Sequence, residues 1–191
     1  DLSAATKTVT DAVTIYANEN ESVSSMLNKA QPTVLLSAAS GMSSSSSADA
    51  IQGILNQFNL SEDQAMHVAD TVEKLSSEIA LDFSKGCDTI SQSIATSGSV
   101  VNEAGMSFEK YAALVSTTAE KTRVSGSQIG NAFKTIFSRI SRSKDGLTTD
   151  AEMSDAEAAL KSVGVSVRRA DGDLRDISDT LDDLNKVCIM Q

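Results

Sequence analysis

Hydrophobic residues recur along most of this chain at the three-to-four-residue spacing of amphipathic α-helices, and the strand-like period of two is rare. Such stripes begin in turn near Val9, Val23, Ile51, Val68, Ile90, Phe108, Ile129 and Ile177. The 191 residues include one Pro, so few positions forbid a helix. The pattern predicts an all-α fold, a multi-helix bundle of about six to eight helices.

The first two stripes predict buried helix faces made of Val9, Ala12, Val13 and Tyr16, and of Val23, Met26, Leu27 and Ala30. Pro32 is expected to end the second helix, because Pro lacks a backbone donor. Ser43 to Ser47 form a serine tract that we interpret as a linker or the start of a helix, with the helix itself beginning near Ser47. This predicts an N-terminal helical segment with a Ser-rich linker at 1–46 and a helical core domain at 47–191, the alternative being one continuous domain, 1–191.

Capping boxes mark three further helix starts, at Ser61 with Gln64, Ser125 with Gln128, and Ser154 with Glu157. The helix after Ser125 carries the clearest stripe, made of Ile129, Phe133, Ile136, Phe137 and Ile140. Aromatic residues make up 4% of the chain and Trp is absent, so this stripe holds much of the aromatic mass. We therefore place it at the centre of the core.

The stretch "VGVSVRRADGDLRDISDTLDDL", from Val163 to Leu184, follows a different pattern from the helical stripes. Alternating valines and the Asp171–Gly172 turn predict one small β-hairpin near Val165 to Leu174. Asp176 and Asp179 then suit the N-terminus of an acidic helix. A calcium loop of the EF-hand type is the alternative, but counting from Asp171 the pattern fails at its fifth, sixth and twelfth positions. We interpret the stretch as a turn followed by a helix.

No residue pattern here points to catalysis. His67 is the one histidine, and without an evident nucleophile or orienting carboxylate we interpret it as a partly exposed structural residue. Motifs of serine hydrolases, nucleotide-binding loops and zinc proteases are missing from the sequence. We expect no catalytic, cofactor-binding or metal-binding residue, and no small-molecule substrate. Cys87 and Cys188 are expected to be two free thiols, a disulfide being the alternative.

The net charge of −10 is unevenly distributed. Residues 1–120 carry 5 Lys/Arg against 15 Asp/Glu, whereas residues 121–191 carry 11 of each. Six cations and no acid lie between Lys121 and Lys144, namely Lys121, Arg123, Lys134, Arg139, Arg142 and Lys144. This basic stretch either complements the C-terminal end of a helix dipole or forms a docking face for an electronegative partner, such as a second copy. The acidic net charge of the whole chain argues against general nucleic-acid binding, and we expect no sequence-specific nucleic-acid partner.

No apolar run reaches the ~18 residues of a membrane span, and no signal peptide is visible. The first residue is Asp rather than Met, so we expect a piece of a longer protein.

Two blocks carry a family resemblance: "MSFEKYAALVSTTAEKTRVSGSQIGNAFKTIFSRISRS" (106–143) and "MSDAEAALKSVGVSVRRADGDLRDISDTLDDL" (153–184). In order, spacing and content they resemble the core region of bacteriophage tail tape-measure proteins, from long-tailed phages of the siphovirus type or from prophages. The match is close over roughly the last half of the chain. The first half is similar only in its Ser/Ala-rich helical character.

The resemblance implies a non-enzymatic structural and assembly protein that sets tail length and acts as a scaffold for the tail tube. It implies partners among the tail tube, tail assembly chaperone and tail tip proteins, with possible self-association. It also implies a location in the tube lumen of the virion, and in the host cytoplasm during assembly. The alternatives are a coiled-coil-like signalling or interaction module and an embedded cell-wall-degrading enzyme.

A helical ruler needs long uninterrupted helix, at ~1.5 Å per residue. This sequence is expected to break at Gly86, Gly105, Gly146, Gly164 and Gly172. We therefore expect a compact domain here, with the family's rod outside it.

Overall fold

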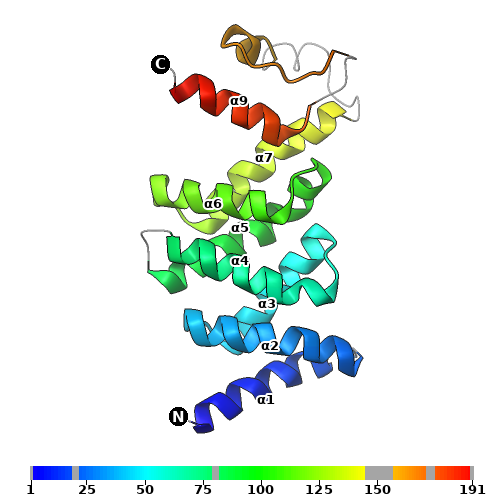
Figure 1. The fold of residues 1–191 in the computed structure, drawn as a ribbon, viewed down its shortest axis with the longest axis vertical. Helices are drawn as coiled ribbons and strands as arrows, with labels where there is room; N and C mark the ends of the chain where they lie inside the picture. The colour runs from blue at the N-terminus through cyan, green and yellow to red at the C-terminus, as the bar shows by residue number, and fades with distance from the viewer. Residues whose placement is uncertain (1, 19–21, 79–81, 145–156, 171–174, 190–191) are drawn as a thin grey trace.

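The computed structural model describes residues 2–18, 22–78, 82–144, 157–170 and 175–189. Its helices lie one above another along the longest axis of the molecule, with α1 at one end and α9 near the other (Figure 1). The described residues are mostly helical and form no strand. The predicted all-α, multi-helix fold is confirmed.

In chain order the first helices are α1 (Leu2–Asn18), α2 (Val23–Ser40), α3 (Ser44–Phe58), the 3-10 turn η1 (Glu62–Gln64) and α4 (Ala65–Glu78). They are followed by α5 (Phe83–Glu103), α6 (Phe108–Thr122), α7 (Gly126–Lys144) and α9 (Ile177–Ile189). Residues 157–162 are also helical. Helix α5 is the centre of the stack, because it packs against α3, α4 and α6 and most extensively against α7.

One hydrophobic core runs through the stack from α2 to α9 and includes Leu36, Ile51, Val68, Ile90, Phe108, Phe137 and Ile177. A smaller cluster of Ala12, Tyr16, Ala30 and Ala48 joins α1 to α2 and α3. Ala12 and Tyr16 are therefore buried as predicted. Val9 was predicted to share their face, but it is 47% exposed.

The α7 stripe lies in the core only in part. Ile129 and Phe137 are 2% and 1% exposed, and Phe133 is half-buried against the same cluster. Ile136 is 48% exposed, because each residue turns the helix by about 100° and carries this side chain past the buried sector. The side chain of Ile140 lies outside the described residues. The core assignment is confirmed for Ile129 and Phe137 and wrong for Ile136.

Helix α2 contradicts the prediction that Pro32 ends it, because it continues through Pro32 to Ser40. Pro32 is buried, and α2 packs against α1, α3 and α4. These tertiary contacts offset the ~3 kcal/mol that a Pro costs inside a helix. The helix ends at Gly41, which adopts a left-handed φ of 72°.

The faces of α2 are also turned differently from the prediction. Val23 and Leu27 were expected inside, yet they are 68% and 60% exposed. Lys29 is fully buried instead, where its Nζ donates to Gln52 Oε1 at 2.7 Å and lies 4.7 Å from the centre of the Tyr16 ring. Since buried polar groups are tolerated when they are hydrogen-bonded, these partners allow a polar face to turn inward.

Serine caps fix several helix starts. The Ser43 hydroxyl accepts a hydrogen bond from Ser46 N at 3.1 Å, so the serine tract begins helix α3 at Ser44 rather than near Ser47. Two predicted capping boxes are present, with Ser61 N and Ser125 N each donating to the side chain of the glutamine three residues later at 3.2 Å. The third predicted capping box begins at Ser154, which lies outside the described residues.

The prediction that Gly86 ends a helix is wrong, because Gly86 lies in the first turn of α5. A Cβ there would lie 3.1 Å from the Cβ of Ser76, so this glycine permits a close approach of α4 and α5. Gly105 and Gly164 do follow helix ends, with φ of +92° and +85°. Gly146 and Gly172 lie outside the described residues.

Of the predicted hairpin near Val165 to Leu174, the structure describes residues 165–170. The turn at Asp171–Gly172 and the returning Leu174 lie outside the described residues. Arg175 N donates to Val167 O at 2.9 Å, so the chain doubles back here. The hairpin itself is not shown and stays a prediction. Helix α9 follows as expected, with Asp176 Oδ1 accepting from Ser178 N at 2.8 Å and Asp179 in the first turn.

Candidate functional site

His67 lies on α4 and pairs with Glu109 of α6. The His67 Nε2 to Glu109 Oε1 distance is 2.8 Å, and both side chains are about half exposed. Desolvation raises the pKa of Glu109, but the hydrogen bonds from His67 and from the backbone outweigh it and leave that pKa lowered. The pair ties two helices together, which supports the structural interpretation of His67.

Cys87 is a buried free thiol, and burial raises its pKa. A raised pKa keeps the thiol protonated and unreactive. The side chain of Cys188 and both Asp171 and Asp173 lie outside the described residues, so the state of Cys188 and the calcium alternative are untested. Within the described part of the chain, no three His, Cys, Asp or Glu side chains gather as metal ligands would.

The predicted basic stretch covers the end of α6 and the whole of α7. Lys121, Arg123, Lys134 and Arg139 are exposed, and the side chains of Arg142 and Lys144 lie outside the described residues. The helix-dipole effect fades beyond the last turn. Lys134 and Arg139 both precede the last turn of α7, so the dipole does not account for them. The docking interpretation of this basic stretch therefore gains support.

A glycine seam holds α7 against α5. A Cβ at Gly126 would lie 2.2 Å from the carbonyl oxygen of Thr89, and one at Gly130 would lie 2.8 Å from that of Ser93. Residues four apart share one helix face, so the α7 backbone lies directly on α5 along this seam. Lys134, four residues after Gly130, lies beside this seam, whereas Arg139 lies on the opposite side of the same helix.

Tyr111 of α6 contacts both α5 and α7. Its hydroxyl hydrogen-bonds to Ser97 Oγ and, at 3.1 Å, to Ser93 Oγ, both on α5. Its ring packs edge-on against Phe133 and Phe137 of α7. Burial raises the pKa of Tyr111, and the two serine hydrogen bonds oppose this shift. One side chain thus connects α5, α6 and α7.

The outward face of α2 is uncharged. Its exposed residues are Val23, Ser24, Leu27, Asn28, Gln31, Leu35, Ala38 and Ala39. The one charge in α2, Lys29, is buried, although 22% of the whole chain is charged. Protein interfaces are depleted of charge at their cores. This face is a second candidate contact surface.

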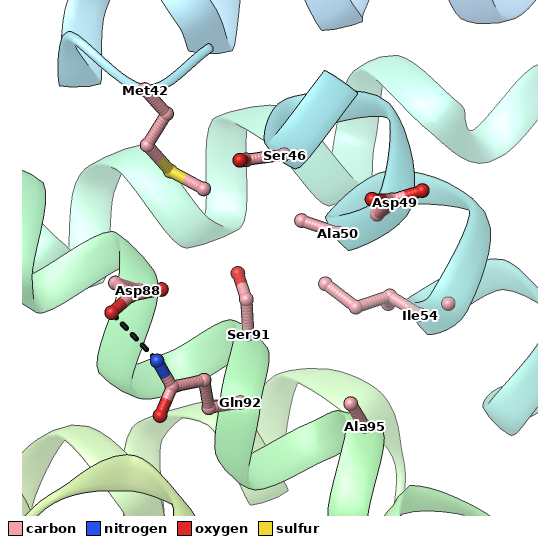
Figure 2. A pocket seen from close by; sticks show the side chains of 10 residues that line it. Met42, Ser46, Asp49, Ala50, Ile54, Asp88, Ser91, Gln92 and Ala95 are labelled. Atoms are coloured by element: carbon pink, nitrogen blue, oxygen red, sulfur yellow. Dashed lines mark hydrogen bonds between the residues drawn. The ribbon is translucent and has the colours of Figure 1, made fainter. Parts of the chain in front are cut away.

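A shallow cleft of about 220 Å³ lies between α3 and α5 (Figure 2). Asp49 of α3 and Asp88 of α5 line it with exposed carboxylates, and Met42 and Ile54 add apolar surface. The Ser91 hydroxyl points from α5 into the space (Figure 2), and its oxygen is buried without a hydrogen-bond partner among the described residues. This lining suits a Lys or Arg side chain, whose charged end would lie near the carboxylates and whose aliphatic part would contact the apolar surface.

The linear pattern did not indicate either the cleft or the inward face of α2. The cleft requires α3 and α5 to pack side by side, and no local signal pairs these two helices. Ser25, Lys29 and Thr33 did form a visible stripe at helical spacing, but a polar stripe ordinarily indicates a solvated face.

A family model for phage-related minor tail proteins matches residues 1–188 of the chain. A probable tape measure protein of Escherichia phage P2 is 26% identical over 145 residues, which cover 76% of this chain and 16% of that protein. The chain thus matches only a small part of this curated relative. No solved structure matches the chain. Since the family match extends over nearly the whole sequence, the chain belongs to the phage-related minor tail protein family.

Proposed function

We propose that this chain is a non-enzymatic structural and assembly domain of a phage tail tape-measure protein, acting in tail-tube assembly and tail-length determination through protein–protein contacts. Family membership makes it a phage tail component. The observation that carries the finer proposal is the similarity to the probable tape measure protein of phage P2 over 76% of the chain. The proposed location is the lumen of the tail tube in the virion, and the host cytoplasm during assembly.

The contact surfaces proposed for this work are the exposed basic stretch of α6 and α7 and the uncharged outward face of α2. The first suits an acidic partner surface, and the second suits a surface that excludes charge. Tail tube, assembly chaperone and tail tip proteins are the proposed partners, together with further copies of the chain. In the described part of the chain, no helix combines the length and the apolar content that crossing a membrane requires.

Within a tape-measure protein, this domain is proposed to organise assembly rather than to be the ruler. Helix α5, with 21 residues, spans about 32 Å at 1.5 Å per residue. The contacts of α1 and α2 with α3, and of α2 with α4, favour residues 1–191 acting as one continuous unit over a division at residue 46.

In-frame deletions in the full-length protein test this proposal. Deleting helical segments outside this domain should shorten tails in proportion, whereas deleting residues 1–191 should abolish tails, as counted and measured by electron microscopy. Tails of normal number and length without this domain would overturn the proposal. A purified chain that releases fragments from cell walls would overturn its non-enzymatic part.

A further inference from the structure

Helix α2 takes part in both hydrophobic clusters of the stack. Ala30, with the partly buried Met26 and Val34, packs in the smaller cluster that joins α1 to α2 and α3. Leu36 belongs instead to the main core. Pro32 lies between Ala30 and Leu36, inside the helix. The change from one cluster to the other therefore falls about one helical turn from the proline.

Pro32 weakens the backbone of α2 at this point. Because a proline has no N–H, the carbonyl of Asn28, four residues earlier, lacks its usual helical donor. The proline ring also crowds that carbonyl, and sharp bends in helices occur most often at prolines. The helix is therefore weakest where it passes from the smaller cluster to the main core.

The layer before Pro32 is held mainly by small side chains. The buried members of the smaller cluster are Ala12, Ala30, Ala48 and Tyr16, and partly buried aliphatic residues surround them. Because hydrophobic stabilisation grows with the apolar area that is buried, the three alanines contribute little. Helix α1 lies at one end of the stack, where it packs against α2 and α3 (Figure 1).

Polar side chains connect this layer to the rest of the stack. Lys29 Nζ donates to Gln52 Oε1 of α3 at 2.7 Å, and the hydroxyls of Tyr16 and Thr33 lie 2.7 Å apart. Lys29 and Thr33 are fully buried. If the layer separates, water replaces these partners and the ammonium of Lys29 regains its hydration. Such contacts therefore contribute little net free energy against opening.

The glycine seam between α5 and α7 is built differently. Gly126 and Gly130 bring the two backbones into direct contact, and the rings of Tyr111, Phe133 and Phe137 pack together beside it. Aromatic side chains bury the largest apolar areas. Opening the stack at this seam therefore costs more free energy than separating the layer before Pro32.

We propose that α1 and residues 23–31 of α2 form a hinged end layer, which opens as a unit at Pro32 while the second half of α2 and helices α3 to α7 stay folded. Proteins open locally in contiguous units whose free energies of opening differ. Each helix of this stack packs mainly against its near neighbours, so an end layer can separate without breaking the rest. Opening exposes the face of α3 around Ala48, which is 1% exposed in the closed chain.

Hydrogen exchange of the 191-residue chain, followed by mass spectrometry in urea below the unfolding midpoint, tests the proposal. We expect the amides of α1 and of residues 26–31 to lose protection together. Their protection should be about tenfold or more below that of residues 33–40 and of α5 to α7. Equal protection before and after Pro32 would overturn the proposal, whether all of α2 stays closed or all of it opens with α1.

Pro32→Ala restores the missing N–H and tests the hinge itself. The protection of residues 26–31 should rise towards that of residues 33–40, and α5 to α7 should not change. Gln31→Ala, at the exposed neighbouring position, is the matched control, because it adds no backbone donor. It should behave like the natural chain. An unchanged Pro32 variant, a uniform change along its whole length, or the same change in Gln31→Ala would overturn the assignment of the hinge to Pro32.

Tyr16→Phe loosens the end layer without touching the glycine seam, because it removes the hydroxyl that pairs with Thr33. The protection of α1 and of residues 26–31 should fall about 5- to 30-fold, and that of α5 to α7 should not change. The matched control is Tyr111→Phe, which removes a buried hydroxyl beside α5 and should lower protection in α5 to α7 instead. Equal loss of protection in all helices of the Tyr16 variant would show that the stack opens as one body, and would overturn the proposal.

Discussion

Gly126 of α7 lies directly against Thr89 of α5, so that a Cβ at Gly126 would be 2.2 Å from the Thr89 carbonyl oxygen. This contact, repeated one turn later at Gly130, sets the distance between the two helices that pack most extensively in the stack. The position of α7 and of its exposed cations Lys134 and Arg139 depends on it.

Gly126→Ala should therefore destabilise the fold. Since the clash is with backbone, relief requires α7 to move, and overpacking of this kind costs ~1–3 kcal/mol. Gly53→Ala is the matched control, because Gly53 lies inside α3 and a Cβ there would meet no neighbouring element within 4 Å. It should instead stabilise by about 0.5–1 kcal/mol through helix propensity. Urea unfolding of both variants measures the difference, and equal effects would contradict the seam.

Phe137→Ala should cost ~3–5 kcal/mol, because Phe137 is buried among aromatic rings of the core. Ile136→Ala, one residue earlier, should cost much less, since Ile136 is 48% exposed. Phe133→Ala should lie between them, because Phe133 is half-buried. Thermal and urea unfolding give these values. Similar stability of the natural chain and the Phe137 variant would remove this stripe from the core.

Tyr111→Phe should lower stability near neutral pH by ~1–3 kcal/mol, because it removes the hydroxyl shared with Ser93 and Ser97. Burial raises the pKa of Tyr111 above its ordinary value of 10.0, so the folded state holds this proton more tightly than the unfolded state. That contribution is complete below pH 10 and is lost as pH rises further. The stability gap between the natural chain and the variant should therefore narrow above pH 10 in urea unfolding, and a constant gap would contradict the burial of this hydroxyl.

Glu109→Gln should change how stability depends on acid. The pKa of Glu109 is lowered from its ordinary value of 4.5. Its contribution is therefore present above that value and is lost as pH falls through the lower, folded-state pKa. Because the pair with His67 is about half exposed, solvent screening limits the effect to below ~1 kcal/mol. Urea unfolding between about pH 6 and 3 should show the variant less stable at the upper end and matching the natural chain at the lower.

The control for this measurement is Glu103→Gln, which removes an exposed glutamate on α5. If it reproduces the acid dependence of Glu109→Gln, the effect belongs to net charge and not to the pair with His67.

Sequence patterns alone predicted the all-α class, the starts of η1 and α7 at their capping boxes, and the burial of Tyr16, Ile129 and Phe137. Each of these depends on interactions between residues a few positions apart, or on a single helical face, which linear spacing records. The family was indicated in the same way, by the two sequence blocks at 106–143 and 153–184.

Contacts between helices explain three features that the sequence patterns did not predict: which face of α2 is buried, why α2 continues through Pro32, and why positions 86 and 126 are glycine. In each case the deciding partner comes from another helix: Gln52 and Tyr16 for Lys29, Ser76 for Gly86, Thr89 for Gly126. The same holds for the α3/α5 cleft, whose two carboxylates come from separate helices. Placing a Gly or a Pro inside a helix costs about 1–3 kcal/mol in helix propensity. Packing between helices contributes more than this, so contacts between residues distant in sequence determine where these helices continue and which faces they bury.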